Sequence, residues 1–152
     1  MKLFVAVTLL TLVATGSAAA ERIWKVDQTV SFAKSGRMAL HFKAGPLKFE
    51  EVVIHNMPTA SDVAKSQKDP SDNSHPKIAV GISNDSGEDM KIRLTVTLED
   101  KAGEVLMRCD RKDSVDGTAT NDHTNLCWLD SVKTIDWPRL ARVHLTATIE
   151  PD

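Results

Sequence analysis

Residues 77–107 have the sequence KIAVGISNDSGEDMKIRLTVTLEDKAGEVLM, and this stretch decides the fold. Its middle part alternates strictly, with polar residues between Met90, Ile92, Leu94, Val96 and Leu98. A period of two is typical of a strand with one buried and one solvated face, and it does not fit a helix.

The segments on either side of this strand continue the pattern. Polar residues at 84–89 and 100–103 predict two turns. The outer segments supply a further apolar row, formed by Ile78, Val80, Ile82, Val105, Met107 and Cys109. Residues 77–107 therefore predict a three-stranded antiparallel meander with one buried face.

Similar alternation predicts strands at 24–32, 37–43, 47–55 and 141–149, and a less regular strand around 126–132. Seven or eight strands with almost no helix predict an all-β fold, a two-sheet antiparallel sandwich of the immunoglobulin-like kind. We expect a single domain at 21–152, with long polar loops at 57–76 and 110–125.

One part of the pattern resembles a known family. The run Val80–Asn84 ends a strand at asparagine, a long alternating strand follows, and the segment Glu99–Val105 contains an Asp-x-x-Gly hairpin. This arrangement resembles the immunoglobulin-like domains of bacterial envelope proteins, with the FxLYD-type family the nearest. The resemblance implies a non-catalytic extracytoplasmic domain, with no individual site residues to transfer.

Residues 1–20 have the features of a signal peptide. Lys2 precedes the apolar run Leu3–Val13, and the small residues Ser17–Ala20 follow. An apolar run of about 11 residues is too short to span a hydrocarbon core of roughly 30 Å. We expect cleavage after Ala20 and a secreted or periplasmic protein without membrane insertion.

The chain contains two cysteines, Cys109 and Cys127. In an exported protein such a pair favours a disulfide, which would stabilise the fold by roughly 3 kcal/mol on the chain-entropy model. Two free thiols are the alternative.

Charge and motifs narrow the functional classes. A formal net charge of −2 does not favour nucleic acid or an anionic membrane as a partner. The sequence contains no Gly-x-Ser-x-Gly, His-Glu-x-x-His or glycine-rich phosphate-binding motif, so we expect no enzyme and no cofactor.

Metal binding is the alternative from another class. The carboxylates Asp110, Asp113, Asp116 and Asp122 lie in the polar segment between the cysteines, and oxygen-rich loops can bind calcium. A solvated loop without an ion explains the same residues.

A second possible metal site combines soft ligands. His55 and Met57 lie two residues apart in an extended segment, which suits copper(I). The competing interpretation is that Met57 fills the core, as methionines usually do. Separately, Asn84 begins an Asn-Asp-Ser glycosylation sequon, which matters only in a eukaryotic secretory pathway.

The leading interpretation is a non-catalytic binding or accessory module that recognises a protein partner. Sandwiches present loops at their ends and free strand edges at their sides, and an edge strand can pair with an extended peptide.

Overall fold

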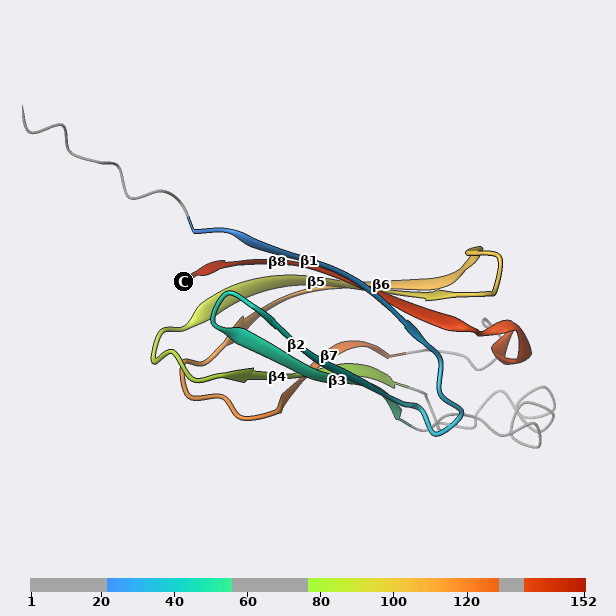
Figure 1. Ribbon diagram of the computed structural model, residues 1–152, viewed down its shortest axis with the longest axis horizontal. Coiled ribbons are helices and arrows are strands. Elements are labelled where there is room, and N and C mark those ends of the chain that lie inside the picture. Colours follow the sequence, from blue (N-terminus) through green and yellow to red (C-terminus); the bar gives the residue numbers. More distant parts are fainter. Residues whose placement is uncertain (1–21, 56–76, 129–135) are drawn as a thin grey trace, which may run out of the picture.

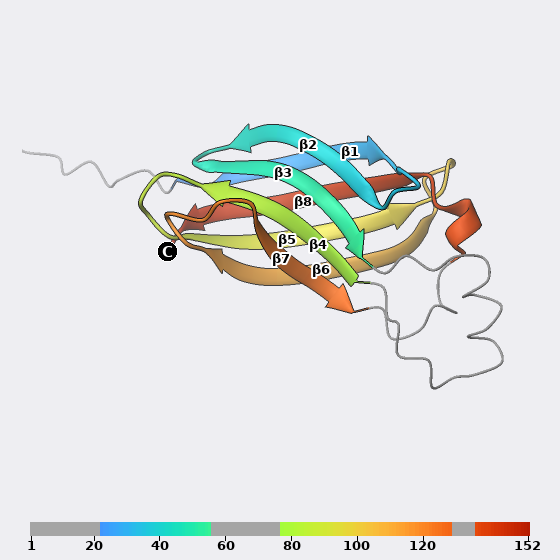
Figure 2. The same cartoon turned by 90° about the horizontal axis from the view of Figure 1, so that it is seen from below.

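The computed structural model describes residues 22–55, 77–128 and 136–152, and for 125–128 it describes the backbone. Two four-stranded antiparallel sheets face each other (Figures 1 and 2). Sheet A contains, in spatial order, β1 (Trp24–Ser31), β8 (Arg142–Pro151), β5 (Met90–Glu99) and β6 (Val105–Val115). Sheet B contains β2 (Arg37–Ala44), β3 (Leu47–His55), β4 (Lys77–Asn84) and β7 (Asp122–Trp128). A short 3₁₀ turn, η2 (Trp137–Arg139), precedes β8.

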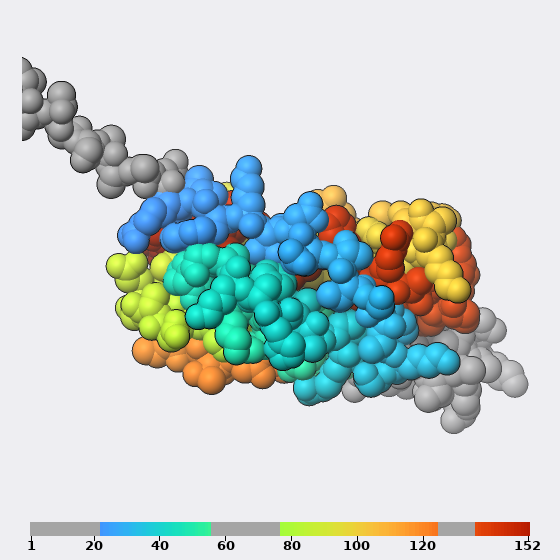
Figure 3. All heavy atoms as spheres, in the orientation of Figure 1, coloured from blue at the N-terminus to red at the C-terminus, as the bar shows by residue number. Residues whose placement is uncertain are grey.

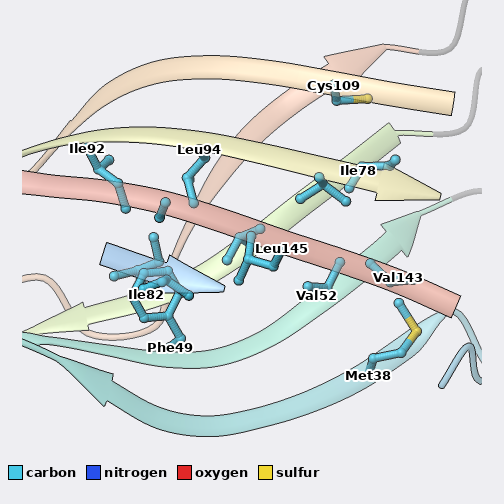
Figure 4. Packing of buried hydrophobic residues seen from close by; sticks show 14 of the residues in the cluster. Met38, Phe49, Val52, Ile78, Ile82, Ile92, Leu94, Cys109, Val143 and Leu145 are labelled. Carbon is cyan, nitrogen blue, oxygen red and sulfur yellow. The ribbon is translucent and has the colours of Figure 1, made fainter. Parts of the chain in front are cut away.

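The predicted all-β sandwich is confirmed, because each sheet buries its inward row against the other. The inward side chains of β5 are at most 1 % exposed, those of β4 are fully buried, and β8 alternates between buried and partly buried residues. Figure 4 shows side chains from both sheets meeting in the middle. The core comprises Val26, Met38, Leu47, Phe49, Val52, Ile54, Ile78, Val80, Ile82, Met90, Ile92, Leu94, Val96, Leu98, Cys109, Val115, Leu140, Val143, Leu145, Ala147 and Ile149.

The predicted three-stranded meander is wrong at its first turn. β5 and β6 form a hairpin in sheet A, whereas β4 pairs with β3 and β7 in sheet B. The segment between Asn84 and Met90 therefore crosses from one sheet to the other, a distance of roughly 10 Å. Ala79 on the outward side of β4 is also buried, whereas outward residues of β5 such as Lys91 are exposed, although both strands are central in their sheets.

The apolar row also ends earlier than predicted. Met107 lies opposite Leu98, but the register shifts between Leu98 and Glu99. The shift places Val105 opposite Glu99, whose side chain faces outward, and Val105 is 56 % exposed. Val105 is therefore not a core residue, because an irregularity in the ladder changes which face a side chain occupies.

The first and last described strands pair within sheet A. β1 pairs along its whole length with β8, from Trp24 opposite Ile149 to Ser31 opposite Arg142. In an immunoglobulin constant domain the first strand pairs with the second, and the last strand lies in the other sheet. This topology therefore does not confirm the immunoglobulin-like part of the prediction.

The predicted polar loop at 110–125 is shorter in the structure. β6 continues through Val115 and β7 begins at Asp122, which leaves 116–121 as the connection. Alternate positions 110, 112 and 114 are polar because they lie on the solvated face of an edge strand. The predicted loop at 57–76 and the predicted signal peptide at 1–20 lie outside the described residues.

Asn84 connects the crossover after β4 to the end of β6. Its side chain is buried, and Nδ2 donates to the carbonyl oxygens of Glu88 (2.8 Å) and Val115 (3.2 Å). Its Oδ1 accepts from the backbone N–H (3.2 Å) and the hydroxyl (2.8 Å) of Ser86. Because both amide hydrogens are used inside the fold, the folded protein has no room for a glycan on this sequon.

Candidate functional site

Within the described residues, no strand pairs with the outer edge of β1, and this free edge has the geometry of a strand acceptor. β1 is an edge strand of sheet A, and its register with β8 continues without a bulge from Trp24 to Ser31. An unpaired strand edge presents a row of backbone N–H and C=O groups to any strand that comes alongside. Lys25 and Asp27 are the two charged residues of this strand.

The neighbouring edge, that of β2 in sheet B, is irregular. The β2–β3 register shifts between Ala39 and Phe42, and His41 has a positive φ of 50°. Bulges of this kind twist an edge and interrupt pairing, which protects it from further strands. Of these two adjacent edges, β1 is therefore the one suited to strand addition.

The side of the sandwich where β1 and β2 approach each other is called the β1–β2 side here. Several apolar side chains along it are partly exposed. They pack on the edge of the core and comprise Trp24, Val30, Leu40, Phe42 and Ala44. Phe42 stacks on buried Phe49 with ring centroids 4.9 Å apart. Figure 3 shows β1 in blue directly above β2 and β3 in teal on this surface.

Trp24 and Gly45 fix one end of this side. A Cβ on Gly45 would lie 2.3 Å from the Trp24 ring, and Gly45 has a positive φ of 57°. The indole therefore packs directly on the β2–β3 turn, and only glycine satisfies both the turn and the contact.

A polar cluster lies on the outer face of sheet B. Glu51 on β3 accepts a hydrogen bond from Arg37 on β2 at 2.8 Å and lies 3.2 Å from His123 Nε2 on β7. The rings of His55 and His123 are 6.1 Å apart. Burial, followed by the charge of Lys77, lowers the pKa of His55 below its ordinary value.

This cluster depends on a small residue at the centre of the sheet. A Cβ on Gly81 would lie 2.3 Å from Asn121 Oδ1 and 3.1 Å from the His123 ring. Two imidazoles and a carboxylate are a common metal-ligand set. However, Glu51 is already paired with Arg37, and within the described ranges no three His, Cys, Asp or Glu side chains gather closely enough to hold a metal ion.

The four carboxylates predicted as calcium ligands are spread over the β6–β7 region. Asp110 and Asp113 lie on β6, Asp116 in the turn, and Asp122 at the start of β7. Arg108 binds Asp110 at 3.1 Å, and its hydrogen bond holds the pKa of Asp110 below the ordinary value. The geometry lends no support to a shared calcium site, and calcium binding stays a prediction.

Other predicted site residues are only partly placed. His55 is the last residue of β3, whereas Met57 lies outside the described residues, so the copper interpretation stays untested. Cys109 is buried on β6, and the backbone of Cys127 lies on β7 in the other sheet. The side chain of Cys127 is outside the described part, so the disulfide also stays a prediction.

Among the described residues, His144 also has carboxylate partners. Its Nε2 lies 2.7 Å from Asp27 and its Nδ1 lies 3.4 Å from Glu99, which in turn is 3.6 Å from Arg142. These contacts connect β1, β8 and β5 across the outer face of sheet A. The arrangement is an ion-pair network on a solvated sheet face, where individual pairs contribute little stability.

Comparison with known proteins identifies no family: no family model matches the chain, and no curated protein matches it significantly. Among the described residues, no helix is long and apolar enough to cross a membrane.

The sequence did not reveal the Arg37, Glu51, His55 and His123 cluster. Alternation within each strand could place these side chains on an outer face. Bringing them together requires the register of β2, β3, β4 and β7, which no local spacing encodes. The free edge of β1 was likewise not predictable from the sequence, because it depends on which strands pair with β1.

Proposed function

We propose that the protein is an exported, non-catalytic binding module that takes up an extended segment of a partner protein along the free edge of β1. The observation that carries this proposal is the unbroken register of β1 with β8 beside partly exposed apolar side chains on the β1–β2 side. Backbone hydrogen bonds to an added strand supply affinity, and contacts of alternate side chains supply specificity.

The residues around β1 determine which partner sequence fits the added strand. In a strand paired with β1, alternate residues would face inward, toward Leu40 and Phe42, and the others would face solvent beside Lys25 and Asp27. The preferred partner segment is therefore extended, with apolar residues at every second position and polar residues between them.

The predicted disulfide is consistent with this proposal. β6 and β7 are the two edges on the opposite side of the sandwich from β1 and β2. A bond between Cys109 and Cys127 would connect the sheets there and leave the β1–β2 side free. The intact mass before and after reduction tests this bond.

In this proposal, the protein resembles immunoglobulin-like envelope domains in its two-layer architecture and not in its strand order. Such domains commonly act as binding modules, and a shared architecture does not by itself define a function. The site on β1 therefore carries the proposal, and the resemblance only agrees with it.

A peptide-display selection on the oxidised protein, residues 21–152, tests the proposal. We expect selected peptides to alternate apolar and polar residues and to protect β1 amides from hydrogen exchange. Gln28 is exposed on β1 at an inward-facing position, opposite Leu145. Gln28→Lys places a charge there and should weaken binding about tenfold or more, because inward-pointing charges block edge pairing.

The control is Thr118→Lys, which adds the same charge in the exposed β6–β7 connection. It should leave binding unchanged. Selected peptides that bind Gln28→Lys as well as the wild type, or that protect strands other than β1, would overturn the proposal.

A further inference from the structure

The outer face of sheet A carries a line of cations that runs across the strands. Lys25 on β1 lies opposite Thr148 on β8, Thr148 lies opposite Arg93 on β5, and Arg93 lies opposite Lys112 on β6. We call these four residues the cationic row. The three basic side chains are exposed, and Thr148 places a hydroxyl between them.

No side chain of the described segments neutralises the cationic row. Lys25, Arg93 and Lys112 have neither a hydrogen bond nor an ion pair within those segments. Arg93 and Lys112 are directly opposite each other, and like charges in this position destabilise an antiparallel pair. The fold therefore retains a repulsion that a bound anion would relieve.

Three of the nearby carboxylates are engaged elsewhere. Asp27 lies 2.7 Å from His144, Asp110 is bound by Arg108, and Asp152 lies 2.7 Å from Lys91. The hydrogen bond from Lys91 lowers the pKa of Asp152, which keeps this carboxylate charged and paired. Glu150 lies opposite Lys91 on the adjoining strand.

A shallow hollow of about 350 Å³ lies over the β5 and β6 part of the row. Arg93, Lys112, Thr148 and Ser114 contribute its basic and hydroxyl groups, and Asp113 and Glu150 contribute carboxylates. The paired side chains of Lys91 and Asp152 complete its charged lining. Cationic groups beside hydroxyl donors provide charge-assisted hydrogen bonds to anionic oxygens, and the carboxylates confine such a ligand to the row.

The carboxylates beside the cationic row limit the width of an anionic ligand that can bind there. The row crosses four strands and so spans roughly 14 Å, at about 4.8 Å per strand. The next residues along each strand on this face lie about 7 Å away, and they include Asp27, Asp110 and Glu150. A membrane surface or a nucleic-acid duplex would bring anionic groups against these carboxylates, whereas a narrow linear polyanion can follow the row.

We propose that the cationic row binds an anionic polysaccharide, with its sulfate or carboxylate groups at Arg93 and Lys112 and its hydroxyl groups at Thr148. This site is separate from the β1 edge in chemistry, because it uses charges on the outer face and not backbone pairing. A single-stranded nucleic acid is less well matched, since such binders rely on aromatic side chains for base stacking and the row has none.

Dextran sulfate is the test ligand, with neutral dextran of equal length for comparison. Binding to residues 21–152 is measured at about 50 mM and 150 mM salt, because screening weakens exposed charge interactions. The double variant Arg93→Gln/Lys112→Gln should weaken binding about tenfold or more, since it removes two charge-assisted contacts. Its melting temperature should be equal to or higher than that of the wild type.

A matched control has the same net charge. Lys43→Gln/Lys101→Gln removes two exposed cations outside the row and should change affinity less than about twofold. Equal losses in both variants, or no binding of dextran sulfate by the wild type, would overturn the proposal. Binding of a single-stranded DNA with equal affinity through Arg93 and Lys112 would overturn the assignment to polysaccharide. Neither result bears on the β1 edge, which Gln28→Lys tests separately.

Discussion

The two turns that flank β5 differ in how their hydrogen bonds are distributed along the chain. In the β5–β6 hairpin, Asp100 Oδ1 accepts from the backbone N–H groups of Ala102 and Glu104, both at 2.9 Å. In the β4–β5 crossover, Gly117 donates to Asp89 at 2.8 Å, and Asn84 donates to Val115. The hairpin is held mainly by neighbours in sequence, whereas the crossover combines local hydrogen bonds within 84–88 with bonds to a distant turn.

The two turns lie at opposite ends of the sandwich (Figure 1). At the crossover end, the backbone of Gly87 also bonds to Gly117 at 3.0 Å, so the β4–β5 and β6–β7 connections support each other. Similar polar turn sequences can therefore close a hairpin or carry the chain between sheets. Mutations at the crossover should therefore cost more stability than mutations at the hairpin.

The largest effect is expected for Asn84→Ala. The substitution removes the side-chain donor to the buried carbonyl group of Val115 and one of the donors to the carbonyl group of Glu88. We expect a loss of about 2–4 kcal/mol in the free energy of unfolding, measured by urea denaturation. The neighbouring exposed Asp85→Ala should stay within about 0.5 kcal/mol. Similar losses at both positions would remove the special role of Asn84.

Glycine substitutions compare the two turns directly. A Cβ on Gly117 would lie 2.4 Å from the backbone carbon of Gly87, which cannot move aside without shifting the crossover. Gly117→Ala should cost about 3 kcal/mol. Gly103→Ala in the hairpin should cost about 1 kcal/mol, because it strains a residue with φ of +87° but meets only the flexible end of Arg142. The reverse order in urea denaturation would contradict the comparison.

A smaller effect is expected for Asp100→Asn, and it should depend on pH. The hydrogen bond from Arg139, followed by that from the Glu104 N–H, holds the pKa of Asp100 below its ordinary value of 3.8. The stability from this carboxylate is therefore present above about pH 4 and is lost as the pH falls below that value. Asp100→Asn should lower the melting temperature at pH 7 and reduce its decrease on acidification.

One outcome of the pH experiment would contradict this prediction. If Asp100→Asn and the wild type lose melting temperature in parallel between pH 5 and pH 3, Asp100 contributes nothing to acid sensitivity. Glu104→Gln serves as the control, because its carboxylate also pairs with Arg139 but accepts no backbone hydrogen bond in the turn.

The smallest effect is expected at Val105, next to the hairpin. Strict alternation assigns this residue to the core, whereas its side chain is 56 % exposed. Val105→Thr should change the free energy of unfolding by less than about 0.5 kcal/mol. Leu98→Ala, on the same hairpin but fully buried, should cost about 2–5 kcal/mol. A large loss at Val105 would show that the register shift after Leu98 is wrong.

The buried row of β5 could be predicted from the sequence because each of its residues obeys a local rule. Met90 through Leu98 alternate without interruption, and the pleat alone then defines one apolar face. The hairpin after β5 was equally readable, since Asp100 and Gly103 supply the side-chain acceptor and the positive φ that the turn needs.

The candidate sites were less predictable because they depend on strand neighbours. His123 was assigned to a loop beside acidic residues, yet it lies on β7 across from Gly81 and near Glu51. Arg93 and Lys112 each occupy an ordinary solvated position of a strand. Only the β5–β6 register makes them a pair of opposed cations.

The sequence by itself determined the period of the strands, the faces that they bury and the positions of most turns. These properties follow from backbone geometry and from the preference of apolar side chains for the interior, both of which act residue by residue. The tertiary structure decided that β4 and β5 lie in different sheets, that β1 pairs with β8 and that the cationic row forms. Those outcomes depend on the packing of segments far apart in the chain, where many pairings satisfy the same alternation and only the complete core selects one.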